Sequence, residues 1–417
     1  MLQTILLQLQ QPHSALRCPP ESLARFAEAV QLSTKTQHFM YTHRQEEGFL
    51  FLFRDIFIAL YDDTSYYVHD VQTPYHRLLA KLLETNTYMM FRRMTVQQSL
   101  SSLVGAYHLT EYCYHMMYEE FIDMPMLEQA AEEAYDEMRR ITLYVEQILV
   151  KSLHHYTFHE QIVIAEMIAD TAEVKEIAEY SRIFKQIVDE VDLLANDTYG
   201  AELELMQHQF FVEGSPETVT EYLKKKRAAE ALLHSNYHER NNVLYVPFHE
   251  LHETEGPYII CVEQTSATKR FNIQTKALVL LIAKLAEQHG RDLCIIPFAD
   301  DVTGHYYFER GDVSVEQLIH FMHHFEDGQA QLLPALSFAL TVIRQNEERK
   351  SGNIIFITEG KPLDEHKLLE PTYQQAVTSF LREHEVDVTA LILNEELFNA
   401  SDYWFLHHVY FAEELLR

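Results

Sequence analysis

The hydrophobic pattern changes after Gly256, and this change limits the folds open to the chain. Short apolar runs at 258–262, 293–298 and 353–358 alternate with longer segments whose apolar residues recur every three or four positions. Continuous apolar runs of this length are typical of strands that are buried on both faces of a sheet. Their alternation with helices predicts a doubly wound, Rossmann-like α/β domain with a mostly parallel sheet.

The same pattern gives the expected elements of this domain. Gly290 is expected to end the first helix, because glycine readily adopts the left-handed conformation that follows many helices. We expect helices at 272–289, 314–325, 332–345 and 370–383, further strands at 305–308 and 386–393, and a last apolar stretch around 405–411.

The first half of the chain reads as helical. Only Gly48 and Gly105 occur in the first 199 residues, whereas seven of the eleven glycines lie from Gly256 onward. Glycine costs about 1 kcal/mol inside a helix, so its scarcity favours helices. Apolar stripes at helical spacing cover about 21–32, 49–61, 74–92, 97–122, 126–152 and 160–195, and a further helix is expected to open at Ser215-Pro216. We therefore divide the chain into an all-α domain at 1–235, a connector at 236–256 and the α/β domain at 257–417.

The charge argues against nucleic acid as the main partner. The formal net charge is −30, of which residues before 245 carry −16 (20 basic, 36 acidic) and the remainder −14 (13 basic, 27 acidic). Both halves carry a net negative charge, which would repel the phosphate backbone of a nucleic acid. The dense basic run Lys224–Arg227 is interpreted as the solvated face of a helix.

Nothing in the sequence indicates export or a membrane span. The first residues lack a basic stretch before a long apolar run, and no segment approaches about 18 uninterrupted apolar residues. The four cysteines, Cys18, Cys113, Cys261 and Cys294, show no metal-ligand spacing. This usage suits a reducing compartment, so we expect a cytoplasmic protein.

Three loops carry a recognisable pattern. In parallel sheets, ligands bind at the carboxyl ends of the strands, which directs attention to the loops there. These loops hold 264–268 (QTSAT), 328–336 (GQAQLLPAL) and the pair Glu359-Gly360 after NIIFIT. In order and spacing they resemble the DxSxS, GGTD…PAL and ITDG signatures of von Willebrand factor A (VWA) domains. The resemblance implies a metal-ion-dependent adhesion site, where oxygen ligands hold Mg²⁺ or Mn²⁺.

Matched to those signatures, the site is degenerate. Ser266 and Thr268 keep two hydroxyls and Glu359 keeps one carboxylate, while Gln264 and Ala330 stand where the family has an aspartate and a threonine. Mg²⁺ depends on carboxylate charge to offset its desolvation, so we expect no tightly bound Mg²⁺ or Mn²⁺ and no other cofactor. Strand alternation should point Glu263 to the opposite face from Gln264, where it could not substitute.

A narrower resemblance concerns the segment that begins at Glu255. The run 255–266 (EGPYIICVEQTS), the following 276–300 and the closing 404–417 are similar to ViaA/CoxE-type proteins, which are bacterial cytosolic VWA partners of MoxR-family AAA+ ATPases. The layout, helical region first and VWA domain last, also resembles that group. The likeness covers about 160 C-terminal residues. It implies a VWA adaptor that works with a MoxR-type ATPase on a client protein.

Other candidate sites favour plainer interpretations. The run His249–Glu253 places its histidines three apart rather than four, unlike the HExxH zinc motif. Glu111 with His115, and the histidines His154, His155 and His159, lack the repeated Glu-x-x-His of di-metal bundles. Cys261 and Cys294 are expected in core strands. The Met- and Tyr-rich stretch 112–121 is interpreted as bundle core, with an adaptable binding surface as the open alternative.

The sequence therefore predicts a protein that is not an enzyme. It has no glycine-rich phosphate loop and no nucleophile elbow, so we expect no ATPase or hydrolase activity. The leading hypothesis is a non-enzymatic adaptor that acts with a MoxR-type AAA+ ATPase in protein remodelling or complex maturation. The alternatives are an ATPase-independent protein scaffold and, third, a Ro-like RNA-binding protein, which the negative charge disfavours.

Overall fold

The computed structural model describes residues 2–9, 16–17, 19–63, 66–67, 73–197, 256–346 and 351–411. The chain divides into two compact units, of which the first comprises Met1–Glu146 and Ser152–Ala172, and the second Gln147–Lys151 and Glu173–Arg417. The predicted helix at 215, the Lys224–Arg227 run, His249–Glu253 and nearly all of the proposed connector at 236–256 lie outside the described residues. One division between the compact units falls at 172/173, so that α10 (Ala172–Asp197) belongs to the second unit apart from its first residue.

In its described residues, the first unit is helical apart from a short two-stranded pairing. Its helices are α1 (Leu2–Leu9), α2 (Pro20–Leu32), α3 (Thr34–Thr42), α4 (Glu47–Tyr61), α5 (Pro74–Leu83), α6 (Asn86–Thr95), α7 (Ser99–Cys113), α8 (Met124–Ile148) and α9 (Phe158–Asp170), with β1 (Leu16–Arg17) paired to β2 (Tyr66–Tyr67). Residues 49–60 of α4 are buried on every side, which makes α4 the central helix of the unit. The rings of Phe26 of α2 and Phe39 of α3 pack on that of Phe53 of α4, and Phe39 also packs on Phe49 of α4.

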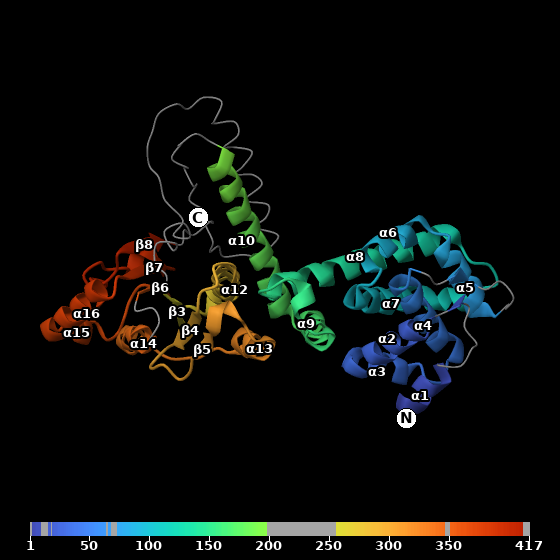
Figure 1. Ribbon diagram of the computed structural model, residues 1–417, viewed down its shortest axis with the longest axis horizontal. Helices are drawn as coiled ribbons and strands as arrows, with labels where there is room; N and C mark the ends of the chain where they lie inside the picture. Colours follow the sequence, from blue (N-terminus) through green and yellow to red (C-terminus); the bar gives the residue numbers. More distant parts are fainter. Residues whose placement is uncertain are drawn as a thin grey trace. The chain divides into compact units, whose positions relative to one another are not determined.

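The second unit is an α/β fold around a six-stranded sheet, as the sequence predicted (Figure 1). Its strands are β3 (Tyr258–Glu263), β4 (Leu293–Phe298), β5 (Tyr306–Phe308), β6 (Gly352–Thr358), β7 (Val386–Ile392) and β8 (His408–Phe411). They lie in the order β5-β4-β3-β6-β7-β8, and all neighbours are parallel except β4 and β5. This is the doubly wound strand order, in which the chain leaves the first strand toward one edge and later crosses to the other side.

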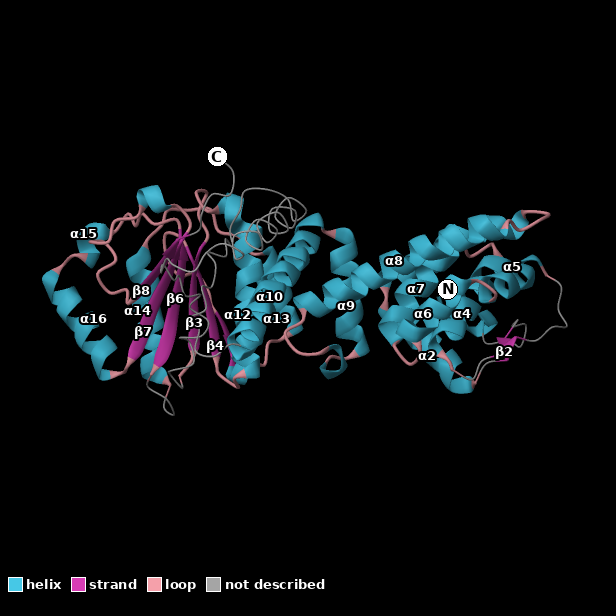
Figure 2. Ribbon diagram, turned by 90° about the horizontal axis from the view of Figure 1, so that it is seen from above, coloured by secondary structure: helices cyan, strands magenta, loops and turns pink. Residues whose placement is uncertain are grey.

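Helices cover both faces of the sheet. In the described residues, the α-helices of this unit are α10 (Ala172–Asp197), α12 (Asn272–Gln288), α13 (Val315–His323), α14 (Leu332–Gln345), α15 (Glu365–Leu368) and α16 (Pro371–Glu383). Leu336 of α14 and Val377 of α16 share one core with Ile354 of β6 and Val388 of β7. Figure 2 shows α14 and α16 on one side of the strands and α12 on the other. As expected, Gly290 has a positive φ of 60° after α12.

The first residues of α10 pack on α12. The Tyr180 hydroxyl accepts a hydrogen bond from the Gln274 amide at 3.2 Å, and the Glu173 carboxylate accepts one from Asn272 at 3.0 Å. Lys276 of α12 is 1% exposed and donates to the carbonyl oxygen of Met322 at 2.7 Å, which links α12 to the end of α13. These polar bonds lie in a buried interface, where each of them fixes the register of two helices.

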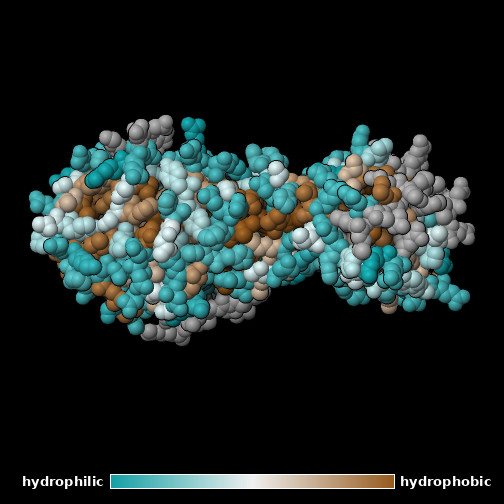
Figure 3. All heavy atoms as spheres, turned by 90° about the horizontal axis from the view of Figure 1, so that it is seen from below, coloured by the Kyte–Doolittle hydropathy of each residue, from teal (hydrophilic) through white to brown (hydrophobic). Residues whose placement is uncertain are grey.

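No helix in the described part of the chain is both long and apolar enough to cross a bilayer. Most side chains on the face of the molecule in Figure 3 are hydrophilic, with apolar side chains reaching the surface in each unit.

Candidate functional site

The candidate site lies at the carboxyl ends of β3 and β6. The chain turns toward β4 after β3 and toward β7 after β6, so the two loops diverge at this point of the sheet. Ligands bind in the crevice at such switch points in doubly wound sheets. The three motif loops of the sequence meet here: the amide of Glu359 donates to Glu263 at 2.9 Å, and that of Leu363 to the carbonyl of Ala330 at 2.9 Å.

Glu263 is the centre of this loop cluster, a role that the sequence had not suggested for it. The side chain is 3% exposed, and its carboxylate accepts hydrogen bonds from the hydroxyls of Thr265 at 2.7 Å and Thr358 at 2.5 Å. Together with the Glu359 amide, three donors from two loops converge on it. The side chains of Glu263 and Gln264 have different partners, as strand alternation predicts, and it is Glu263 that contacts Thr358 at the end of β6. Because all six residues of β3 are buried, the sequence carried no sign of which face was which.

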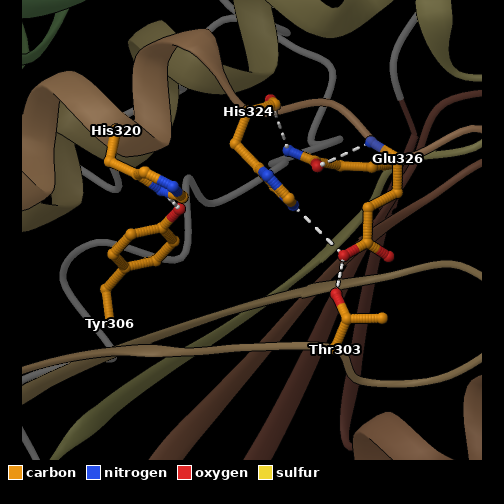
Figure 4. A network of polar contacts seen from close by, with 6 residues as sticks. Thr303, Tyr306, His320, His324 and Glu326 are labelled. Carbon is orange, nitrogen blue, oxygen red and sulfur yellow. Dashed lines mark hydrogen bonds and ion pairs between the residues drawn. The ribbon is translucent and has the colours of Figure 1, made fainter.

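Gln264 instead joins the loop that follows α13. Its amide nitrogen donates to the carbonyl of His324 at 3.5 Å, and its amide oxygen accepts from the backbone amide of Glu326 at 3.3 Å. The Glu326 carboxylate also contacts the His324 ring at 3.1 Å and the hydroxyl of Thr303 (Figure 4). Nearby, the Tyr306 hydroxyl lies 2.6 Å from the His320 ring nitrogen. Gln264 thus acts as a neutral clamp between β3 and the α13–α14 loop.

The predicted ligand positions differ in their surroundings. Thr268 is 2% exposed, and its hydroxyl donates to the carbonyls of Glu263 and Thr265 and accepts from the Thr265 amide at 3.1 Å. Ser266 is exposed, and its hydroxyl has no hydrogen bond with the other residues that the structure describes. Thr268 therefore stabilises its own turn, while Ser266 is available to solvent or a partner.

Glu359 is half-buried beside Glu263. Burial, and then the Glu263 carboxylate, raise the pKa of Glu359, whereas Arg270 and a hydrogen bond with the Asn394 side chain oppose the rise. The next residue, Gly360, has φ 114°, and a Cβ there would lie 2.8 Å from Ile392. Only glycine fits that conformation and that space without strain.

These residues do not form a ligand set suited to Mg²⁺ or Mn²⁺. Both oxygens of Glu263 already accept protein hydrogen bonds, Thr268 is bound to backbone groups, and Ala330 has no side-chain oxygen. Hard cations require several oxygen ligands around one point, with charge to replace hydration. Among the described residues, no group of three His, Cys, Asp or Glu side chains is placed to hold a metal ion.

Asp364 ties the second and third motif loops together. It is 3% exposed and accepts hydrogen bonds from the amides of Leu332 at 3.0 Å and Leu333 at 2.8 Å, the first residues of α14. A carboxylate at this place satisfies unpaired amides and interacts favourably with the helix dipole. Sequence reasoning missed this residue, because a helix cap usually comes from the residue just before the helix.

The remaining candidates have structural roles. Cys261 and Cys294 are buried in the sheet, and burial raises the pKa of both thiols, that of Cys294 to about 12. The Met- and Tyr-rich stretch is divided: Met116 and Met117 are buried, as predicted for bundle core, whereas Phe121 at its end is 84% exposed.

Comparisons with known proteins give remote similarities. No protein-family model matches the chain. An uncharacterized protein of Methanocaldococcus jannaschii is 24% identical over 123 residues, which cover 29% of this chain and 28% of that relative. The SpRpn10 VWA domain aligns with a TM-score of 0.28 and 10% identity, covering 37% of this chain and 87% of that domain.

A second solved structure, an aerotolerance-related membrane protein from Bacteroides fragilis, aligns with a TM-score of 0.23 and 18% identity, over 33% of this chain and 67% of that one. At these TM-scores the two likenesses carry no argument about function.

Proposed function

We propose that the protein is a non-enzymatic adaptor whose α/β unit is a VWA-type docking domain, and that its partner is a MoxR-type AAA+ ATPase acting on a client protein. The docking face is the carboxyl edge of β3 and β6, with Ser266 and Lys269 among its exposed side chains. The partnership with the ATPase rests on the sequence resemblance to ViaA/CoxE-type proteins.

The arrangement around Glu263 is the observation that best supports a docking role. Its carboxylate accepts hydrogen bonds from Thr265, Thr358 and the Glu359 amide, and in this proposal it holds the loops in place rather than acting as a general base or a metal ligand. Polar groups that are mutually satisfied in this way give a loop surface a fixed shape. A fixed, polar surface at a switch point suits recognition of another protein by shape and hydrogen bonds.

The fold also supports this proposal. The strand order, the single antiparallel neighbour pair β4–β5 and the convergence of the three motif loops at one edge agree with the VWA pattern inferred from sequence. In this proposal the partner binds the loops that meet where Glu263 accepts from the Glu359 amide.

The test is a binding and activity assay with the full-length chain. The protein would be purified with a MoxR-type ATPase encoded beside it, and complex formation would be followed by size-exclusion chromatography and ATP hydrolysis. We expect co-elution and a changed hydrolysis rate, and we expect Ser266→Arg with Lys269→Glu to reduce both.

The matched control is Glu383→Arg, which changes an exposed residue of α16 near the opposite end of the strands. It should bind as the unmodified protein does. If neither co-elution nor a change in hydrolysis occurs, the ATPase partnership is wrong. If Glu383→Arg weakens binding as much as the loop variant does, the proposed docking face is wrong. Tight RNA binding in moderate salt would favour the Ro-like alternative.

A further inference from the structure

The helical unit exposes methionines on α6. Met89, Met90 and Met94 are 57%, 47% and 44% exposed, although their helix is only ten residues long. Apolar side chains scattered singly on a surface need no explanation, but three on one short helix are unusual. Methionine is flexible and polarizable, and therefore suits binding surfaces that adapt to a partner.

Two of these methionines lie on the side of α6 that borders α8. The amide and hydroxyl of Thr87 donate to the Glu128 carboxylate at 2.9 and 2.7 Å, and the ring of Phe91 packs on that of Tyr135 at 5.3 Å between centroids. Met90 and Met94 follow Thr87 by three and seven residues, which places them on its side of the helix. Met89 follows Thr87 by only two residues and points away from that side.

The neighbouring surface of α8 is acidic. Glu132 and Asp136 are exposed and follow Glu128 at intervals of four residues, so the three carboxylates form a row along the helix. Between residues 111 and 137 the chain has nine acidic residues and no lysine or arginine, namely Glu111, Glu119, Glu120, Asp123, Glu128, Glu132, Glu133, Asp136 and Glu137. Arg93 is exposed on α6, and on α8 the exposed Arg139 and Arg140 follow Asp136 by three and four residues, with Arg140 paired to Glu137. The apolar side chains are therefore bordered by a row of three carboxylates that ends at these two arginines.

We propose that this α6–α8 face, formed by Met90, Met94 and the row Glu128, Glu132 and Asp136, binds a basic amphipathic helix of a partner protein. A helix with apolar residues on one stripe and lysines or arginines four apart beside it would match both features. Carboxylates at four-residue spacing lie about 6 Å apart, as do basic residues at the same spacing on a partner helix. The apolar stripe would pack on the methionines, as in other helix-in-groove complexes.

The charge distinguishes this occupant from others. A phosphate backbone or an anionic membrane surface would be repelled by the carboxylate row. This face lies wholly in the helical unit, so the inference does not depend on whether the α/β unit binds an ATPase.

The test uses the full-length protein and three synthetic peptides of about 18 residues. The first is a leucine–lysine helix with one apolar stripe, the second has the same composition in shuffled order, and the third replaces each lysine by glutamate. Binding would be measured by fluorescence anisotropy at moderate salt. We expect the first peptide to bind at least about tenfold more tightly than the other two.

Protein variants locate the binding face. Met90→Glu with Met94→Glu, and separately Glu132→Lys with Asp136→Lys, should each weaken binding of the first peptide about tenfold. Met89→Glu is the control, because it places a glutamate on the same helix but on the other side, and it should change binding less than about twofold. Circular dichroism would establish that each variant keeps its helix content.

Methionine oxidation gives a readout that needs no variant. With the first peptide bound, Met90 and Met94 should be oxidised by dilute peroxide several-fold more slowly, while Met89 keeps its rate. Equal binding of the ordered and shuffled peptides would overturn the proposal, as would equal effects of Met89→Glu and the Met90/Met94 pair. Unchanged oxidation of Met90 and Met94 in the bound state would also overturn it.

Discussion

The carboxylate of Glu263 accepts a hydrogen bond from the hydroxyl of Thr358 at 2.5 Å across the two central parallel strands of the sheet. This bond, with those from Thr265 and the Glu359 amide, makes one buried side chain the common acceptor for the loops after β3 and β6. Burying a carboxylate is costly unless such donors compensate it. The arrangement therefore predicts a strong dependence of the α/β unit on this residue.

Replacing Glu263 by alanine should lower the free energy of unfolding of the α/β unit by about 3 kcal/mol, because three buried donors lose their acceptor. Glu263→Gln should cost about half as much, since its amide oxygen can still accept. Denaturant unfolding followed by the fluorescence of Trp404, the chain's only tryptophan, reports on this unit. Glu359→Gln is the control and should cost less than about 1 kcal/mol. Equal losses for the alanine variant and the control would contradict the role given to Glu263.

Substitutions of Thr268 and Ser266 should have clearly different effects on the free energy of unfolding in the same assay. Thr268→Val keeps the shape but removes a hydroxyl that bonds to backbone groups of Glu263 and Thr265, so a loss of about 1–2 kcal/mol is expected. Ser266→Ala removes an exposed hydroxyl and should change stability by less than about 0.5 kcal/mol. The reverse order would mean that Ser266 has a structural partner and Thr268 does not.

Divalent cations should not stabilise the protein measurably. Since Glu263 and Thr268 are occupied by protein hydrogen bonds, millimolar Mg²⁺ or Mn²⁺ should raise the melting temperature by less than about 1 °C. Elemental analysis of the purified protein would accompany the melting curves, with Glu359→Ala as the comparison. Stoichiometric metal that disappears in Glu359→Ala would show that a working adhesion site has been retained.

Lys276 should make stability depend on pH above neutrality. Burial lowers its pKa from 10.5 to about 8 in the folded protein, with Glu173 opposing the change. Between about pH 8 and 10.5 the unfolded chain therefore binds a proton that the folded chain does not, so stability rises with pH in this window. Below about pH 8 the Lys276 amine is charged in the folded protein as well, and burial of this charge lowers the free energy of unfolding by its full amount.

The measurement is unfolding of the unmodified protein and of Lys276→Met at pH 7.5 and 9.5. From pH 7.5 to 9.5 the unmodified protein should gain about 1–2 kcal/mol relative to the variant. Parallel pH profiles would mean that the Lys276 amine titrates as it does in water.

The α/β half of the fold could be predicted closely from its sequence, while the helical half could be predicted only in outline. Leu332–Gln345 forms a helix with the predicted bounds, because strands and helices of different period alternate there. The stripe at 74–92 proved to be two helices, separated near Thr85, whose hydroxyl accepts from the Tyr88 amide. The stripe at 160–195 also divides, at Thr171. Threonine within a helical pattern gives little warning of such a break.

The meeting of the three motif loops could be predicted, but not the contacts of their side chains. The three loops meet as the strand pattern implied, since carboxyl ends of parallel strands share an edge. Which of Glu263 and Gln264 contacts the loop after β6 could not be predicted, because a strand buried on both faces has no polar alternation to fix its orientation. Asp364 was missed because its contact with α14 joins residues more than thirty positions apart.

The cap that Asp364 provides to α14 has a consequence for how these loops can vary. Asp364 lies in the loop after β6, but it accepts hydrogen bonds from the first amides of α14, which follows the second motif loop. The structure of each loop therefore depends on the other. Grafting residues 359–364 into a related domain would leave its α14 start uncapped unless an acidic residue came with them. Exchange of specificity between such proteins would therefore require the two loops to be transplanted as a pair.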